Sequence, residues 1–278
     1  MMATVKAPDH DGNLLQSLKG KVVWITGGGS GIGEVAAQHF ARCGANVAIS
    51  QRNAEKLERV RHALVEDTGN QNILALPADV ADEAAVQQAV AEILERFGGL
   101  DILFANAGVN GVWAPIEDLA ADEWDHTITN NLRSTFLCTK YTVPHLKTRG
   151  GGAIIITSSI EGTRRFDNPE AIAYACTKAA QVTFAKMMAI ELGRHHIRVN
   201  AICPGAISSG IGSERTEKRN TAEAHIEVKY PEGRIPLTGD VKGNPKQVAD
   251  LVLFLASDAA AHITGTEVFI DGGQSLLQ

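Results

Sequence analysis

The chain has 278 residues, of which 44% are hydrophobic, and it carries a formal net charge of -6. This length fits one large α/β domain or two small ones, and the apolar content is ample for a buried core. The negative charge argues against a general nucleic-acid-binding or membrane-binding surface, and no apolar run approaches the length of a membrane span.

Cysteine usage indicates a reducing environment. Cys43, Cys138, Cys176 and Cys203 are far apart and have no C-x-x-C spacing, so we expect neither a metal site nor a disulfide. We expect four reduced thiols in or near the core of a cytoplasmic protein. Residues 1–17 are polar and lack the apolar core of a signal peptide, so we expect residues 1–18 to form a flexible N-terminal extension.

Short β-branched runs alternate with longer amphipathic stretches after this extension. In chain order we expect a strand at 22–25, a helix at 31–43, a strand at 46–50, a helix at 53–67, a strand at 73–76, a helix at 82–97, a strand at 101–105, a helix at 121–148, a strand at 153–157, a helix at 173–193 and a strand at 198–202. This alternation is typical of βαβ units, so it predicts an α/β fold with a doubly wound parallel sheet of about seven strands and helices on both faces. Only 206–243, which is polar, charged and rich in glycine, breaks the pattern. We expect it to be a lid on a single domain that spans 19–278.

The first predicted strand runs directly into a glycine-rich turn, Thr26-Gly27-Gly28-Gly29-Ser30-Gly31-Ile32-Gly33, which opens a helix. Glycines allow positive φ angles and let the backbone approach a pyrophosphate, while the helix N-terminus offers unpaired N–H groups to the phosphates. A tight turn alone would not need five glycines in seven positions. The context therefore predicts a dinucleotide site in a Rossmann-type fold.

The end of the second strand indicates which dinucleotide is preferred. A carboxylate there would hold a ribose 2′-hydroxyl, whereas an arginine would attract a 2′-phosphate. The chain has Ser50-Gln51-Arg52-Asn53 and no acid. We therefore expect NADP(H) to be favoured, with NAD(H) possible, although Arg52 also fits a solvated residue that opens the next helix.

Tyr174 and Lys178 are four residues apart in a predicted helix, which puts a phenol and an ammonium on one face. A free tyrosine has a pKa of about 10, and a nearby positive charge is expected to lower that pKa towards neutral pH. Such pairs also occur by chance on solvated helices. Beside a redox cofactor, the pair becomes a candidate proton donor and acceptor.

These two motifs, Thr-Gly-x-x-x-Gly-x-Gly at 26–33 and Tyr-x-x-x-Lys at 174–178, make the chain resemble the short-chain dehydrogenase/reductase family from about residue 19 to 273. Asn106-Ala107-Gly108 and Asp271-Gly272-Gly273 are similar to further family segments, with Ala105 in place of the first asparagine of the former. The resemblance implies that Asp79 and Val80 contact adenine, that Pro204-Gly205-Ala206-Ile207 holds the nicotinamide amide, and that Ser209 meets the phosphates. The expected cofactor-binding residues are Gly27, Ser30, Gly31, Ile32, Gly33, Gln51, Arg52, Asp79, Val80, Asn106, Ala107, Gly108, Tyr174, Lys178, Pro204, Gly205, Ile207 and Ser209.

The resemblance also implies four catalytic residues: Asn131, Ser159, Tyr174 and Lys178. Ser159 is the second serine of Thr157-Ser158-Ser159, and Ser158 is the alternative, although we expect Ser158 only to satisfy backbone groups. The distance in sequence from Ser159 to Tyr174 is about two residues longer than is usual for the family, which a loop at 161–170 can absorb.

The implied activity is NAD(P)(H)-dependent interconversion of a carbonyl and a secondary alcohol. Tyr174 would act as general acid or base and Ser159 as an oxyanion hydrogen-bond donor. Lys178 would lower the pKa of Tyr174 and bind the nicotinamide ribose, and Asn131 would hold a water that links Lys178 to solvent. No metal is needed, and the family implies a homotetramer of 222 symmetry that acts on a small molecule.

Two other functions remain open at this point: a nucleotide-sugar epimerase or dehydratase, and a non-catalytic dinucleotide sensor. The short region after 206 argues against the first, and the complete catalytic set argues against the second. The sequence does not identify the substrate or the physiological direction. Arg164 and Arg165 fit either a grip on a substrate anion or a solvated loop, and Trp113 fits either the pocket or a core edge.

Overall fold

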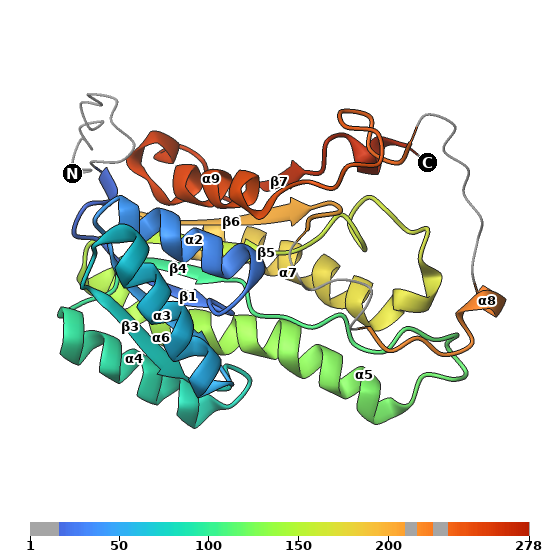
Figure 1. Ribbon diagram of the computed structural model, residues 1–278, viewed down its shortest axis with the longest axis horizontal. Coiled ribbons are helices and arrows are strands. Elements are labelled where there is room, and N and C mark those ends of the chain that lie inside the picture. The colour runs from blue at the N-terminus through green and yellow to red at the C-terminus, as the bar shows by residue number, and fades with distance from the viewer. Residues whose placement is uncertain (1–16, 209–215, 225–232, 278) are drawn as a thin grey trace.

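The computed structural model describes residues 17–208, 216–224 and 233–277. Seven parallel strands form one sheet in the order β3-β2-β1-β4-β5-β6-β7 (Figure 1). The strands are β1 (Val22–Thr26), β2 (Asn46–Gln51), β3 (Ile73–Pro77), β4 (Ile102–Ala105), β5 (Gly152–Thr157), β6 (Ile197–Pro204) and β7 (Glu267–Ile270). This arrangement confirms the predicted fold class.

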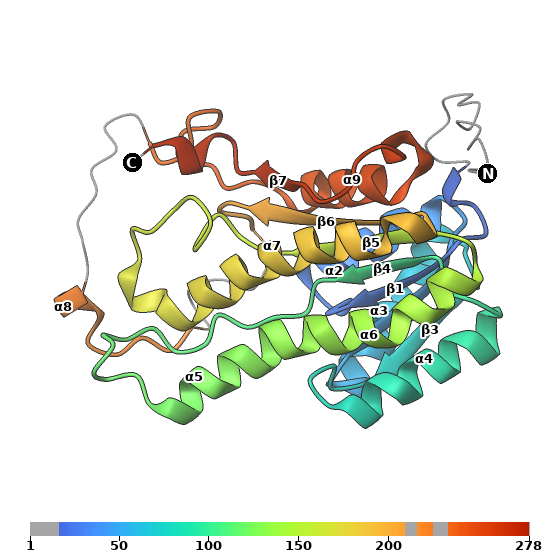
Figure 2. The same cartoon turned by 180° about the vertical axis from the view of Figure 1, so that it is seen from behind.

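Helices cover both faces of the sheet. The helices α2 (Gly31–Arg42), α3 (Ala54–Thr68) and α9 (Pro245–Ala256) lie on one face. The opposite face carries α4 (Glu83–Phe97), α6 (Ser134–Thr148) and α7 (Ile172–Leu192), as Figure 2 shows from behind. The remaining helical elements are α5 (Ala121–Ile128), the π-helical turn η1 (Thr129–Arg133), α8 (Thr221–Ala224) and the 3-10 turns η2 (Pro169–Ala171), η3 (Gly193–His195), η5 (Asp258–Ala260) and η6 (Gln274–Leu276).

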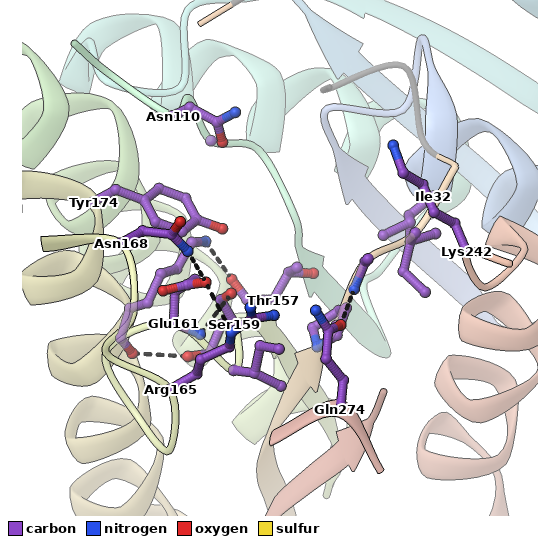
Figure 3. Close-up of a pocket in the computed structure, with 18 of the residues that line it drawn as sticks. Ile32, Asn110, Thr157, Ser159, Glu161, Arg165, Asn168, Tyr174, Lys242 and Gln274 are labelled. Carbon is purple, nitrogen blue, oxygen red and sulfur yellow. Dashed lines mark hydrogen bonds and ion pairs between the residues drawn. The ribbon is translucent and has the colours of Figure 1, made fainter. Parts of the chain in front are cut away.

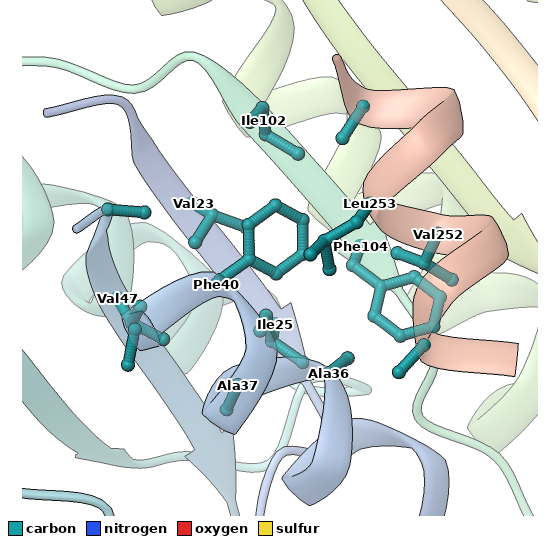
Figure 4. Close-up of a cluster of buried hydrophobic side chains, with 14 of the residues drawn as sticks. Val23, Ile25, Ala36, Ala37, Phe40, Val47, Ile102, Phe104, Val252 and Leu253 are labelled. Carbon is teal, nitrogen blue, oxygen red and sulfur yellow. The ribbon is translucent and has the colours of Figure 1, made fainter. Parts of the chain in front are cut away.

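Alternation along the strands separates two hydrophobic cores. Val23 and Ile25 of β1 belong to the cluster under α2 and α9, while Trp24 belongs to the cluster on the other face. Successive side chains of a strand point to opposite faces, so a strand buried on both sides needs apolar residues throughout. Figure 4 shows Phe40 of α2 and Phe104 of β4 packed in the first cluster.

Local sequence signals fix several helix ends. The side chain of Asn53 accepts a hydrogen bond from the backbone N–H of Lys56 at 2.8 Å, which caps the N-terminus of α3. Gly69, with φ of 70°, ends the same helix in the left-handed conformation. Asp82 and Gly98 cap α4 in the same way.

The strand order places the site. The strand order reverses between β1 and β4: from β1 the chain continues to β2 and β3 towards one edge of the sheet, and from β4 it continues to β5, β6 and β7 towards the other edge. In open α/β sheets, such a switch point leaves a crevice at the carboxyl ends of the strands, where ligands bind. Helices α5 and α7 extend past these ends of the strands (Figure 1).

The structure corrects some expectations. The helix predicted at 121–148 is interrupted by the π-helical turn η1, and Cys176 is exposed rather than near the core because it lies on the outer side of α7. Part of the predicted lid and most of the N-terminal extension lie outside the described residues. Within the described part of the chain, no helix combines the length and apolar character that a membrane crossing requires.

Candidate active site

The glycine turn between β1 and α2 leaves room for a ligand backbone. Gly27 and Gly31 have φ angles of 68° and 57°, which favour glycine. A Cβ on Gly33 would lie 2.3 Å from the carbonyl oxygen of Gly27, so a side chain there would push the helix off the turn. Ser30, the N-cap residue of α2, makes no side-chain capping bond. The helix N-terminus is therefore free of a side-chain cap and fits a pyrophosphate.

Gln51 stands where the sequence predicts the contact that distinguishes the two dinucleotides. A Cβ on Gly29 would lie 2.1 Å from Oε1 of Gln51, so this side chain lies directly against the turn. Arg52 follows it and is exposed. A neutral amide thus lies beside the turn, an exposed arginine follows it in the chain, and no carboxylate ends β2.

Asn106 ties three strand ends together beside this turn. Its backbone N–H donates to Oγ1 of Thr26 at 3.0 Å, and its side-chain Nδ2 donates to the Thr26 carbonyl oxygen at 3.2 Å. Its Oδ1 accepts from the hydroxyl of Thr157 at 3.1 Å. Ala107 also donates to Oγ1 of Thr26, at 3.0 Å. These bonds fix the segment after β4 against the ends of β1 and β5.

A cavity of ≈ 440 Å³ opens at this edge of the sheet. Figure 3 shows Ser159, Tyr174 and Glu161 grouped on one side of it, with Ile32 and Gln274 towards the other. Among the predicted site residues, those that line the cavity are Ser30, Ile32, Asn106, Gly108, Ser159, Tyr174, Lys178, Pro204, Gly205 and Ile207. The other predicted site residues that the structure describes are not part of its lining: Gly27, Gly31, Gly33, Gln51, Arg52, Asp79, Val80, Ala107 and Asn131.

Ser158 and Ser159, at the end of β5, have different roles. The hydroxyl of Ser158 donates to the carbonyl oxygen of Lys178 at 2.8 Å, which confirms the expected backbone role. The hydroxyl of Ser159 accepts from the N–H of Glu161 at 3.1 Å, and Figure 3 shows Ser159 on the same side of the cavity as Tyr174. Because a backbone N–H occupies one lone pair of Ser159, its own proton stays available for an acceptor.

The pKa of Tyr174 is raised to about 12. Burial against the cavity wall is the largest cause, the Glu161 carboxylate adds to it, and the hydrogen bond with Ser159 opposes both. The pKa of Tyr174 is thus raised and not lowered as expected, and Lys178 is not among the groups that shift it. At neutral pH Tyr174 is a phenol, which can donate a proton.

Lys178 is held from two sides. Its Nζ donates to the carbonyl oxygen of Thr157 at 2.8 Å and to Oε1 of Gln181 at 3.0 Å, and it lies 5.3 Å from the centre of the Tyr174 ring. Burial lowers the pKa of Lys178 to about 8. The ammonium is thus fixed beside the phenol ring, and it is still mostly protonated at pH 7.

Asn131 lies in the π-helical turn η1, a feature found often at functional sites. Its Nδ2 donates to the Val109 carbonyl oxygen at 2.9 Å and to Oγ1 of Thr177 at 3.1 Å, and its Oδ1 accepts from the Val109 N–H at 2.7 Å. The backbone carbonyl of Asn131 accepts from Nε2 of Gln181 at 3.0 Å. Gln181 therefore connects Lys178 to Asn131 directly.

The segment after β6 is braced by the C-terminal turn. The N–H of Ala206 donates to Oε1 of Gln274 at 2.8 Å, and a Cβ on Gly205 would lie 2.7 Å from both this oxygen and Cβ of Asp271. This packing explains the glycine at 205. Ser209, predicted to meet the phosphates, lies outside the described residues.

Asp79 and Val80, predicted to contact adenine, follow β3 at the same edge of the sheet. Oδ1 of Asp79 accepts from the N–H of Ala81 at 3.0 Å, so this carboxylate orders the turn that leads to α4. Val80 is buried.

The loop at 161–170 lies between Ser159 and Tyr174 and faces the cavity. Arg165 is buried and donates to Asp167 from both Nε and Nη2. Arg164 stacks over the ring of Phe269, 3.6 Å from its centre. Trp113 lines the cavity, and Nζ of Lys218 lies 4.8 Å from its ring centre.

Residues of the site that were not singled out from the sequence include Glu161, Asn168, Gln181 and Gln274. Gln181 follows Lys178 by three residues on one helix face, and a polar residue at that position of a buried face is the signal that could have identified it. Glu161 and Asn168 belong to the loop whose conformation no motif determines.

This arrangement joins the cavity beside the glycine turn to a half-buried tyrosine and to a buried serine and lysine, the set of groups that hydride transfer to a carbonyl needs beside a nicotinamide. A family model described as enoyl-(acyl carrier protein) reductase matches residues 27–275. The chain belongs to the short-chain dehydrogenase/reductase family.

Relatives over most of the chain support this assignment. Levodione reductase of Leifsonia aquatica is 36% identical over 92% of this chain and 94% of its own length. D-threitol dehydrogenase of Mycolicibacterium smegmatis is 36% identical over 93% of this chain and 94% of its own length.

Solved structures agree. A 3-ketoacyl-ACP reductase from Sinorhizobium meliloti is 50% identical, with a TM-score of 0.89 over 92% of this chain and 100% of that one. A 3-ketoacyl-(acyl-carrier-protein) reductase from Brucella melitensis, complexed with NADH, is 33% identical with a TM-score of 0.80 over 93% and 100%. The protein is an NAD(P)-dependent oxidoreductase of carbonyl and alcohol groups on a small molecule, and neither the epimerase nor the sensor alternative is favoured.

Proposed function

We propose that Tyr174 is the general acid and base of this oxidoreductase and that Ser159 positions the reacting oxygen. The observation that carries the proposal is that both side chains line the same cavity, on the same side of it (Figure 3). A substrate oxygen that meets both hydroxyls is held where a proton can pass to it.

In the direction of carbonyl reduction, the hydroxyl of Tyr174 gives its proton to the substrate oxygen while Ser159 donates a hydrogen bond to it. The nicotinamide, when bound, supplies or takes up the hydride. The raised pKa of Tyr174 keeps it a phenol at neutral pH, which is the form that donates the proton in reduction, whereas oxidation uses the tyrosinate as the base.

Nζ of Lys178 lies over the ring of Tyr174, 5.3 Å from its centre. By family resemblance, Lys178 binds the ribose of the nicotinamide. Lys178 and Gly108 both line the cavity, and Gly108 lies beside the amine, since a Cβ there would be 3.8 Å from Nζ of Lys178. Asn131 stays our candidate for holding a water that links Lys178 to solvent, and Gln181 joins the backbone carbonyl of Asn131 to Lys178.

The test replaces each hydroxyl in turn. Tyr174→Phe is expected to lower turnover at least ~100-fold, the usual scale for a general acid, with dinucleotide binding kept. Ser159→Ala is expected to lower turnover by a similar order. Ser158→Ala is the matched control, because its hydroxyl binds the Lys178 carbonyl oxygen, and it should keep turnover within a few-fold. Near-normal turnover of Tyr174→Phe would refute the assignment.

We propose that NADP(H) is the preferred cofactor. The support is the absence of a carboxylate at the end of β2 and the presence of Gln51 and exposed Arg52 there. Gly27, Ser30, Gly31, Ile32 and Gly33 would bind the pyrophosphate. Arg52→Ala is expected to raise the KM for NADPH about tenfold, the value of a charge-assisted contact, while the KM for NADH stays constant. Wild-type preference for NADH would contradict the proposal.

We also propose that the protein is a cytoplasmic homotetramer. Large apolar side chains are exposed on α6 and α7, among them Phe136, Met187 and Ile190. Such patches are typical of subunit interfaces. Light scattering is expected to give four times the chain mass, and Ile190→Glu is expected to lower it; a monomeric wild type would contradict the proposal.

A further inference from the structure

The wall of the cavity beside Ser159 carries a carboxyl group with no part in the proton transfer described above. Glu161 lies two residues after Ser159, its side chain is only 15% exposed, and it lines the cavity. Figure 3 shows the Glu161 side chain on the same side of the cavity as Ser159 and Tyr174, the residues proposed to hold the reacting oxygen. Figure 3 shows Glu161 between Asn168, Ser159 and Arg165.

The loop that carries Glu161 is fixed against the catalytic helix. Gly162 has φ of 75°, and a Cβ there would lie 2.1 Å from the carbonyl oxygen of Ala175. The N–H of Gly162 donates to the Arg165 carbonyl oxygen at 3.1 Å, which closes the loop on itself. Glu161 is therefore presented by a backbone packed directly beside Tyr174, and its position relative to the proton donor is set by the fold.

The groups around Glu161 suit a hydroxyl and oppose an anion. Oε1 of Glu161 accepts from Nδ2 of Asn168 at 2.7 Å, and Nε of Arg165 lies 3.9 Å from it. The guanidinium of Arg165 is directed mainly to Asp167, its double hydrogen-bond partner, and the Asp167 and Glu170 carboxylates also face Glu161. Next to Glu161 the carboxylates outnumber the one guanidinium, whereas the cations Lys178, Lys218, Arg234 and Lys242 line other parts of the cavity. The part of the wall beside Glu161 therefore suits a neutral hydroxyl better than an anion.

Burial and these carboxylates raise the pKa of Glu161 to about 7. A carboxyl group that titrates near neutral pH can accept a hydrogen bond or donate one. It can therefore bind a hydroxyl in either direction of the reaction, and a neighbouring carbonyl when it is protonated.

We propose that Glu161, supported by Asn168, binds a second oxygen of the substrate on the carbon next to the reacting one. The preferred substrates are then α-hydroxy ketones and, in the oxidation direction, vicinal diols. This inference rests on the proposed roles of Tyr174 and Ser159, because those residues fix where the reacting oxygen lies.

The experiment compares matched ketones that differ only in the second oxygen: hydroxyacetone with acetone, acetoin with butanone, and adipoin with cyclohexanone. Wild-type kcat/KM is expected to favour the hydroxylated member about 10- to 100-fold, the value of one hydrogen bond to a charged group. Glu161→Leu is expected to remove this preference by lowering kcat/KM for the hydroxy ketones, with plain ketones changed less than about threefold. Asn168→Ala is expected to reduce the preference in part, and Glu117→Gln, an exposed acid outside the cavity, to leave it unchanged.

Equal wild-type kcat/KM values for both members of each pair would overturn the inference. So would a wild-type enzyme that turns over none of the hydroxy ketones. An equal fall for both members in Glu161→Leu would also overturn it, because that pattern indicates a structural role. The proposed function is judged separately: Tyr174→Phe must abolish turnover of both members of a pair, whatever Glu161 does.

Discussion

The replacement Gln181→Leu tests how the lysine of the site is held. Gln181 is fully buried, and leucine has a similar volume, so the change removes hydrogen bonds without a large cavity. Three bonds are lost: to Nζ of Lys178 at 3.0 Å, to the Asn131 carbonyl oxygen at 3.0 Å and to Oγ1 of Thr135 at 2.8 Å.

The cost of this change is concentrated on Lys178. The carbonyl oxygen of Asn131 still accepts from Oγ1 of Thr135 at 2.8 Å, so these two groups keep each other as partners. Lys178 keeps the Thr157 carbonyl oxygen but loses its second acceptor. A hydrogen bond to a charged group contributes about 1.5–3 kcal/mol, so we expect the free energy of unfolding to fall by about 2 kcal/mol while Lys178 is an ammonium.

The same loss lowers the pKa of Lys178. In the wild type, burial places the pKa of Lys178 at about 8. A loss of about 2 kcal/mol corresponds to roughly 1.5 pKa units, so the pKa of Lys178 in the variant should be lower than the wild-type value by that amount. The destabilisation should be full at pH 6, where wild-type Lys178 is charged, and should shrink above pH 8, where the amine is neutral in the folded wild type.

The assay is urea unfolding followed by circular dichroism at pH 6 and pH 9, at one fixed protein concentration because an oligomer adds a concentration term. Thr183→Ala, an exposed change on the same helix, is the control and should stay within ±0.5 kcal/mol. An equal loss for Gln181→Leu at both pH values, or no loss at pH 6, would refute the reasoning.

Three further predictions concern the loop and the core. The pKa of Glu161 in the folded protein is raised from 4.5 to about 7, so its contribution to the free energy of unfolding is full below pH 4.5 and is lost as the pH rises through 7. Over that range the wild type should lose roughly 3 kcal/mol relative to Glu161→Gln, measured by urea unfolding. Parallel pH profiles of the two proteins would contradict this. Gly162→Ala should lower the free energy of unfolding by at least ~1 kcal/mol, because Gly162 has a left-handed backbone conformation and an added Cβ would collide with the Ala175 carbonyl oxygen. It should also lower kcat/KM for hydroxy ketones. An unchanged midpoint of urea unfolding would count against a rigid loop. Phe40→Ala in the core shown in Figure 4 should cost about 3–5 kcal/mol in thermal or urea unfolding; a loss under 1 kcal/mol would mean that this core repacks.

The fold followed from the sequence because its signals are local. Hydrophobic runs, the Asn53 and Asp82 caps and the glycine turn each act within a few residues, so the predicted strands and helices match the structure within one or two residues at most ends. The π-helical turn η1 did not follow, since neither composition nor periodicity distinguishes one extra residue in a helical turn.

The sequence by itself also identified Ser159, Tyr174 and Lys178 as one site, because ordered motifs mark the ends of the strands that carry them. The tertiary structure decided how these groups behave. Burial, not the neighbouring lysine, controls the pKa of Tyr174, and Gln181 holds Lys178. It also placed Glu161 beside Ser159. Burial and contacts between segments far apart in the chain depend on how the elements pack, and no local pattern of residues records that packing.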